Sequence, residues 1–109
     1  MHDRHKMKHI CKTYDEKWFN ALNALRVAPS INNCQPWTLE QRENGFDLFE
    51  NEHKKRPELE KYSEISMGVA LKHFEIGCRY DNIDIEYRKF IVKNKRKKSY
   101  FISIVEKNV

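Results

Sequence analysis

The longest periodic segment of the sequence lies between Lys61 and Tyr80. Its apolar residues recur every three or four positions, which is the spacing of one face of an α-helix. Five of them share that face: Met67, Ala70, Leu71, Phe74 and Cys78. The apolar arc extends to a neighbouring face through Ile65, Val69 and Ile76. A helix that is apolar over so wide an arc is usually buried on more than one side, so the segment predicts packing partners on both.

Two glycines, Gly68 and Gly77, lie inside this predicted helix. Each costs about 1 kcal/mol relative to alanine in a helix interior. Close packing against another backbone would offset that cost. The glycines therefore predict a close backbone approach along the helix.

The N-terminal part of the chain divides into a lead-in and a shorter helix. Residues Met1 to Lys12 are basic and rich in histidine without periodicity, so they predict a loose lead-in. Asp15 is a plausible N-cap for an amphipathic helix over Asp15 to Val27, and Pro29 stops it. We expect a flexible basic N-terminus over residues 1–14 and a partial domain over residues 15–109.

Period-two patterns predict the strands. Two short runs flank Asn44-Gly45, the strongest local signal for a β-hairpin, and they cover Thr38 to Arg42 and Phe46 to Glu50. A later strand is predicted by alternating residues followed by two more apolar ones: Ile83, Ile85, Tyr87, then Phe90 and Val92. The last strand is predicted by Tyr100, Ile102 and Ile104. The order of helix, hairpin, long helix and two strands is an α+β pattern.

Composition limits which classes of protein the chain can belong to. The chain has 109 residues, 34% charged residues and a net charge of +5 at pH 7. The positive excess could suit an anionic partner, although a solvated surface is the favoured interpretation. No segment approaches the roughly 20 apolar residues that span a bilayer, and no secretory signal is present, so we expect a cytoplasmic protein. The wide spacing of Cys11, Cys34 and Cys78 predicts reduced thiols.

The segment 28–37, which reads APSINNCQPW, is a loop by composition. Ser30 can donate and accept a hydrogen bond, and so can the amides of Asn33 and Gln35. The prolines stiffen the loop, so less entropy is lost on binding. Such a loop suits the polar edge of a planar heterocycle such as a flavin. Similar loops often only cap or turn the chain, and Trp37 is more often a core aromatic than a ligand platform.

Two motifs in this order resemble the nitroreductase superfamily. The run ALRVAPSINNCQPW over residues 24–37 is similar to its APSxxNxQPW signature. The run ISMGVALKHFEI over residues 65–76 is similar to the helix that follows, which in one branch reads roughly D-I-G-I-A-x-x-H-F-E. Members of that branch carry two related halves in one chain and mimic the usual homodimer. This chain most resembles their C-terminal half, over about residues 18–82.

The resemblance implies a nitroreductase-like half-fold, with the long central helix at a pseudo-dimer interface, and FMN bound between two halves. Carried over by motif, Pro29, Ser30, Asn33 and Gln35 would lie beside the flavin. The implied reaction is two-electron transfer from NAD(P)H through FMN to a nitroaromatic or quinone acceptor. The cofactor performs the chemistry, so no side chain need act as a catalytic nucleophile or base.

The sequence departs from the family pattern. The R-R-S-x-R-type motif that grips the FMN phosphate is absent, although residues 4–6 are basic. Ser66 stands where the helix motif often has Asp, and Ile31-Asn32 replaces small residues of the loop motif. Typical members are nearly twice as long. We therefore expect a partial or remnant chain, completed by a second copy in a homodimer or by a complementary N-terminal half.

Two other functions stay open. The missing phosphate motif is compatible with a non-catalytic module that dimerises or binds a partner through the apolar helix. The basic run Lys93 to Lys98 could mark a nucleic-acid binder, but it lacks the interleaved aromatics that stack on bases, so a solvated connection is favoured. By residue type a metal could be ligated by His2, His5, His9 and Cys11. These residues have no closing partner in sequence, so we predict no metal site.

Overall fold

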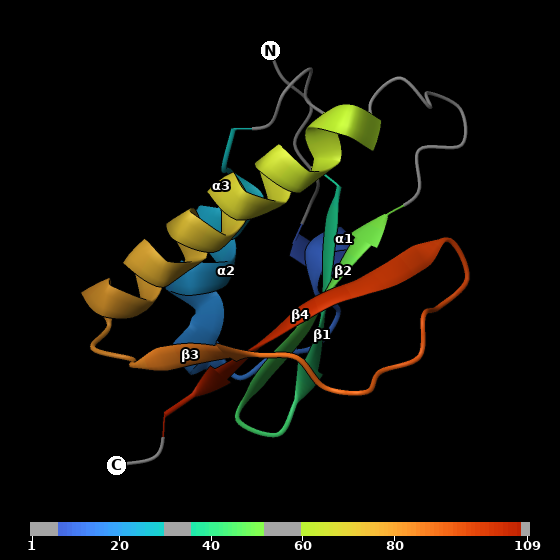
Figure 1. Cartoon of the computed structure of the whole chain (residues 1–109). Coiled ribbons are helices and arrows are strands. Elements are labelled where there is room, and N and C mark those ends of the chain that lie inside the picture. Colours follow the sequence, from blue (N-terminus) through green and yellow to red (C-terminus); the bar gives the residue numbers. More distant parts are fainter. Residues whose placement is uncertain (1–6, 30–35, 52–59, 108–109) are drawn as a thin grey trace.

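The long apolar segment forms a single helix, α3, which spans Glu60–Tyr80 and crosses the molecule in Figure 1. The structure is a computed structural model that describes residues 7–29, 36–51 and 60–107. The other helices are α1 (Met7–Ile10), the 3-10 turn η1 (Glu16–Trp18) and α2 (Phe19–Arg26). The strands are β1 (Trp37–Arg42), β2 (Gly45–Asn51), β3 (Ile85–Arg88) and β4 (Lys98–Glu106). The predicted order of elements and the α+β class are confirmed.

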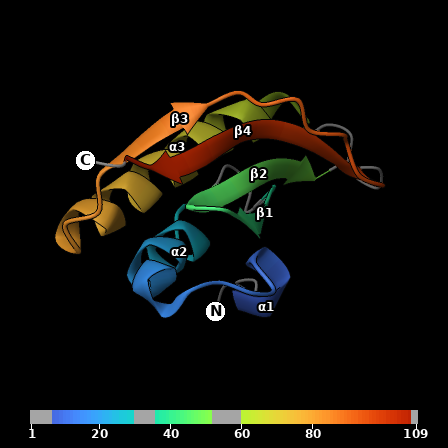
Figure 2. The same ribbon diagram turned by 90° about the horizontal axis from the view of Figure 1, so that it is seen from below.

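The four strands form one antiparallel sheet in the order β1-β2-β4-β3. The last strand of the chain therefore lies inside the sheet, between β2 and β3. Helices α2 and α3 lie beside each other and pack against the sheet, as Figures 1 and 2 show. None of the helices in the described ranges is both long and apolar enough to cross a bilayer.

Three aromatic side chains join the helical layer to the sheet. Trp18 contacts Phe46 of β2 edge-on, with ring centroids 5.3 Å apart, and stacks on Phe74 of α3 at 6.0 Å. Phe46 and Phe74 meet edge-on at 6.1 Å. All three are almost fully buried. Each such pair adds about 0.5–1.5 kcal/mol beyond the burial of apolar area, so this cluster anchors the core.

The shorter helix begins where Asp15 was predicted to cap it. The Asp15 carboxylate accepts a hydrogen bond from the Lys17 amide at 3.1 Å. The first turn is a 3-10 turn rather than an α-helical one. The helix then buries Ala21, Leu22 and Leu25 against α3 and the sheet. The predicted amphipathic helix is confirmed, with a tighter start.

The predicted close backbone approach occurs at one of the two glycines of α3. A Cβ atom at Gly77 would lie 2.7 Å from the Ala21 Cα and 3.1 Å from its amide nitrogen. The α2 and α3 backbones touch there because neither residue has a bulky side chain. At Gly68 a Cβ atom would meet nothing within 4 Å, so close packing does not explain this glycine.

The second apolar face of α3 is not covered within the described part of the chain. Met67, Ala70 and Phe74 are fully buried, as predicted. By contrast, Ile65 and Ile76 remain 58% and 55% exposed. The expectation of burial on two sides is therefore not met within one chain. The wide arc instead leaves an apolar stripe on the surface.

The predicted hairpin is present, but its turn lies one residue earlier than expected. Arg42 pairs with Gly45, which leaves Glu43 and Asn44 as the turn. Of these two turn residues, only Asn44 has a positive φ, of 61°. A Cβ atom at Gly45 would collide with the Ile104 carbonyl oxygen of β4. This glycine is needed for the close approach of a neighbouring strand rather than for the turn.

The third strand is shorter than predicted. It ends at Arg88, so the expected continuation through Phe90 and Val92 is wrong. The Phe90 amide donates to the Tyr100 hydroxyl at 3.0 Å, and the Phe90 ring lies 4.0 Å from the Arg42 guanidinium. These contacts hold the connection between β3 and β4 over the outer face of the sheet, so it does not pair with β4 as a continued strand. The last strand, β4, forms where alternation predicted it.

The N-terminal segment is more ordered than the sequence suggested. The expected loose lead-in over Met1 to Lys12 contains the short helix α1 and two core residues, Ile10 and Cys11, which are 0% and 1% exposed. Residues 1–6 lie outside the described part. The proposed boundary between residues 14 and 15 stays a prediction, although the core already includes side chains that precede it.

The contrast between the two α3 glycines can be tested with a matched pair of variants. Gly77→Ala would push the α2 and α3 backbones apart, so we expect it to lower the free energy of unfolding by about 1–3 kcal/mol. Gly68→Ala meets no neighbour and gains helix propensity, so it should raise that free energy by up to about 1 kcal/mol. Urea unfolding followed by circular dichroism measures both. Equal effects of the two substitutions would contradict the close helix contact.

Candidate functional site

The structure describes both ends of the loop 28–37 and not its middle. Pro29 is exposed directly after α2, as expected for the residue that ends the helix. Ser30, Asn33 and Gln35 lie outside the described residues, so their convergence on one ligand stays a prediction. Pro36 is fully buried at the other end.

Local hydrogen bonds fix where the loop leaves α2 and where it enters the sheet. The Ala28 amide donates to the Leu25 carbonyl at 3.1 Å, which closes a tight turn after the end of α2. The Pro36 carbonyl accepts from the Asn51 amide at 2.7 Å, which starts the β1–β2 ladder one residue before Trp37. The span available to the loop is therefore set by α2 at one end and by the hairpin at the other.

Among the described residues, two buried polar side-chain atoms have no hydrogen-bond partner. They are the indole Nε1 of Trp37, which follows the loop, and the hydroxyl of Ser63, in the first turns of α3. Both residues are fully buried. A buried donor without a partner costs about 1–3 kcal/mol, so such groups need an explanation. Trp37 itself is a core aromatic, as the sequence analysis favoured. The sequence did not mark Ser63 as a site residue, because a serine near the start of a helix is common.

The helix motif has a structural role in the described part of the chain. Phe74 belongs to the aromatic cluster. The Glu75 carboxylate accepts from the Lys72 ammonium at 3.1 Å and from the Tyr87 hydroxyl of β3 at 3.2 Å. The hydrogen bond from Lys72 is the main reason that the pKa of Glu75 is lowered, while burial raises the pKa of Tyr87. Glu75 thus joins α3 to β3.

Neither described cysteine is suited to nucleophilic chemistry. Cys11 and Cys78 are free and buried. Burial raises the pKa of Cys11 to about 11 and that of Cys78 to about 12, so both thiols are neutral near pH 7. This agrees with the expected reduced thiols. Cys34 lies outside the described residues.

A planar ligand with polar edges needs hydrogen-bond donors and acceptors that water does not satisfy. Trp37, which follows the amide-rich loop in the sequence, has such a donor in its unpartnered indole Nε1. The basic motif expected to grip the phosphate is absent from the sequence.

The fold and the loop define a mixed α+β protein with a candidate binding loop between helix α2 and strand β1 of the sheet. Residues 1–78 match the family described as "Putative TM nitroreductase", and the chain belongs to this family. The matched region contains the loop motif and the helix motif. Membership of the family supports a nitroreductase-like function in general. No curated protein and no solved structure matches the chain.

The orphaned hydroxyl generates a prediction about stability. Ser63→Ala removes a buried unpaired donor, so the free energy of unfolding without ligand should rise by about 1 kcal/mol. Ser66→Ala is the matched control in the same helix, since Ser66 is equally buried but has an interaction partner. Thermal and urea unfolding of both variants measure the difference. A Ser63→Ala protein that is less stable than the Ser66→Ala protein would show that the hydroxyl is satisfied.

Proposed function

We propose that the chain is half of an FMN-dependent oxidoreductase of nitroreductase type. The observation that carries this proposal is the family match over residues 1–78, which includes both sequence motifs. The proposed reaction moves two electrons from a nicotinamide donor to an acceptor such as a nitroaromatic or a quinone. FMN would supply the redox chemistry when bound. The residues of the chain would bind and orient it.

The loop between α2 and β1 would hold the ring. Ser30, Asn33 and Gln35 would offer hydrogen bonds to its heteroatoms, and Pro29 would restrict the loop before binding. Trp37 supports this role because its ring is fully buried and fixes the end of the loop. Its unpartnered Nε1 would supply a further donor at that end of the loop.

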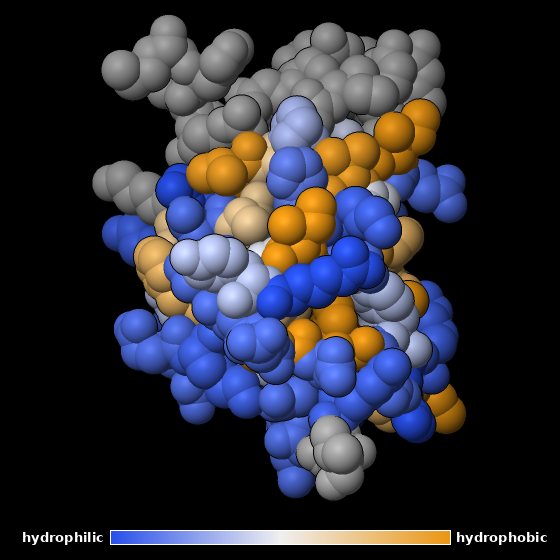
Figure 3. Space-filling view, turned by 90° about the vertical axis from the view of Figure 1, so that its left-hand side faces the viewer, coloured by the Kyte–Doolittle hydropathy of each residue, from blue (hydrophilic) through white to orange (hydrophobic). Residues whose placement is uncertain are grey.

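A second half would complete the site. The absent phosphate motif and the uncovered stripe of α3 both favour this arrangement. The stripe includes Ile65, Ile76 and Tyr80, which is 81% exposed. On the side of the molecule shown in Figure 3, apolar side chains stand between polar ones. A homodimer, or a complex with a complementary half, would cover them.

The flavin proposal is tested by the colour and affinity of the purified chain. We expect FMN to bind and give the yellow absorbance of oxidised flavin. Asn33→Ala and Gln35→Ala should each weaken FMN binding by about fivefold, since each loses a hydrogen bond worth roughly 1 kcal/mol. Asn32→Ala is the matched control, because it removes an amide from the same loop outside the family signature. A protein that stays colourless with excess FMN would refute the proposal.

The assembly proposal is tested by sedimentation velocity. We expect the natural chain to be dimeric and Ile76→Glu to shift it to monomer, because a charge would be buried at the interface. Ile91→Glu is the control, since Ile91 is fully exposed on the β3–β4 connection. If both variants sediment like the natural chain, the α3 stripe is not the interface. A dimer that fails to bind FMN would support the alternative function, a non-catalytic dimerisation module.

A further inference from the structure

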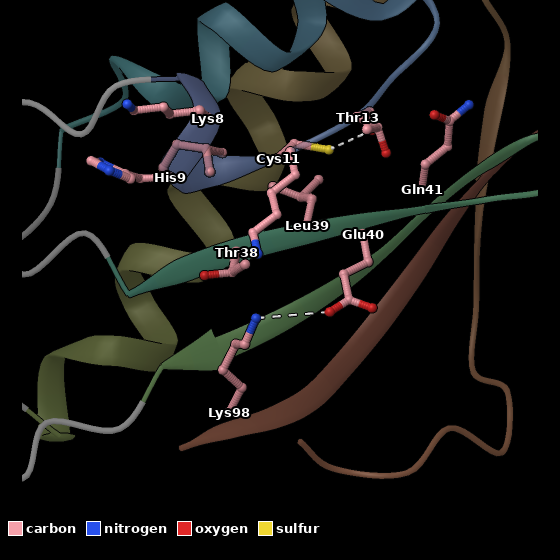
Figure 4. A pocket seen from close by; sticks show the side chains of 11 residues that line it. Lys8, His9, Cys11, Thr13, Thr38, Leu39, Glu40, Gln41 and Lys98 are labelled. Atoms are coloured by element: carbon pink, nitrogen blue, oxygen red, sulfur yellow. Dashed lines mark hydrogen bonds and ion pairs between the residues drawn. The ribbon is translucent and has the colours of Figure 1, made fainter. Parts of the chain in front are cut away.

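A cleft of about 490 Å³ lies between α1 and β1, away from the exposed stripe of α3. One wall consists of residues 8–13 and the other of residues 38–41, with Lys98 added from β4 (Figure 4). It forms because β1 is an edge strand and α1 packs beside it. Clefts of roughly 300–1,000 Å³ are the usual size for small-molecule sites.

The base of the cleft is apolar and its ends are polar. Ile10, Cys11 and Leu39 are at most 1% exposed and belong to the core. Figure 4 shows Cys11 and Leu39 between Lys8 and His9 at one end and Thr13 and Gln41 at the other. Packed apolar side chains therefore close the base of the cleft, while hydrogen-bonding groups stand at its ends.

Positive charge dominates the described residues that line the cleft. Three lysines, Lys8, Lys12 and Lys98, stand against a single carboxylate, Glu40. That carboxylate is already matched by the Lys95 ammonium at 3.0 Å and the Lys98 ammonium at 3.8 Å. Because a concave, low-dielectric wall concentrates the field of its charges, the cleft attracts anions.

The cysteine in the wall does not make the cleft a reactive site. The Cys11 thiol donates to the Thr13 carbonyl at 3.3 Å and is almost fully buried. The thiol contributes packing surface, so the chemistry that the cleft offers is binding alone.

We propose that this cleft binds a small organic anion, with a phosphate or carboxylate group at one end and a short apolar body. The lysine ammonium groups would bind the charged group, and the Thr13 hydroxyl and the Gln41 amide would offer hydrogen bonds at the end of the cleft opposite Lys8. The apolar body would lie in the middle of the cleft, whose base is closed by Leu39 and Ile10. This site is separate from the flavin proposal, since none of its groups belongs to the loop 28–37.

Titrations of the complete, isotope-labelled chain followed by NMR test the proposal without FMN. The probes are phenyl phosphate, benzoate, inorganic phosphate and phenol. We expect phenyl phosphate or benzoate to shift the backbone amides of residues 8–13 and 38–41, and to bind more tightly than inorganic phosphate or phenol. The stronger of the two organic anions identifies the preferred acidic group. No shift in these segments, or phenol binding as tightly as the anions, would overturn the proposal.

Variants that change the charge of the cleft test whether its lysines bind the anion. Lys8→Gln combined with Lys12→Gln should weaken binding of the preferred organic anion by about tenfold. Lys93→Gln combined with Lys107→Gln removes the same charge from exposed positions outside the cleft and should change affinity by less than about twofold. Glu40→Gln should strengthen binding by about threefold, a gain that misfolding cannot mimic. Equal losses in the two double variants, or weaker binding by Glu40→Gln, would contradict a specific site.

Discussion

The contact among Trp18, Phe46 and Phe74 determines where every other part of the molecule can lie. Trp18 leads into α2, Phe46 belongs to β2 and Phe74 to α3, so the three rings bind segments that are far apart in the sequence. Neither helix can bury its apolar face alone, and each needs the sheet and the other helix. The contact of Gly77 with Ala21 then brings the two helix backbones together on the same side of the sheet.

The opposite face of the sheet has no helical layer among the described residues, and polar contacts cover it instead. The Asp47 carboxylate accepts from Arg42 at 2.8 Å and from the Ser103 hydroxyl at 2.6 Å. Ser103 also shares a 2.7 Å hydrogen bond with Tyr100. Phe90 closes this network by packing on Arg42. Because Asp47, Ser103 and Tyr100 satisfy one another's hydrogen bonds, this part of the outer face stays stable without a second apolar core.

Strand β1 links the two proposed sites while keeping them separate. Its first residue, Trp37, is fully buried and fixes the end of the loop proposed to hold a flavin. Residues 38–41 line the cleft proposed to bind an organic anion. The α3 stripe is a third and distinct surface, whose proposed role is to meet a second half.

The sequence by itself determined the features that depend on neighbours along the chain. Periodicity located α3 to within one residue of its start, and the Asn-Gly signal located the hairpin. The two motifs pointed to the family that the match over residues 1–78 shows. The same local patterns could not place the side chains of the candidate loop, because their convergence depends on contacts beyond it.

Only the tertiary structure decided which segments approach closely. It assigned Gly45 to the packing of β4 rather than to the turn, and it ended β3 early because Phe90 pairs with Arg42 and Tyr100. It also buried Ile10 beside β1 and so created the cleft. The physical reason is that hydrophobic periodicity fixes the faces of an element, whereas the partner of each face is chosen by packing between residues distant in sequence.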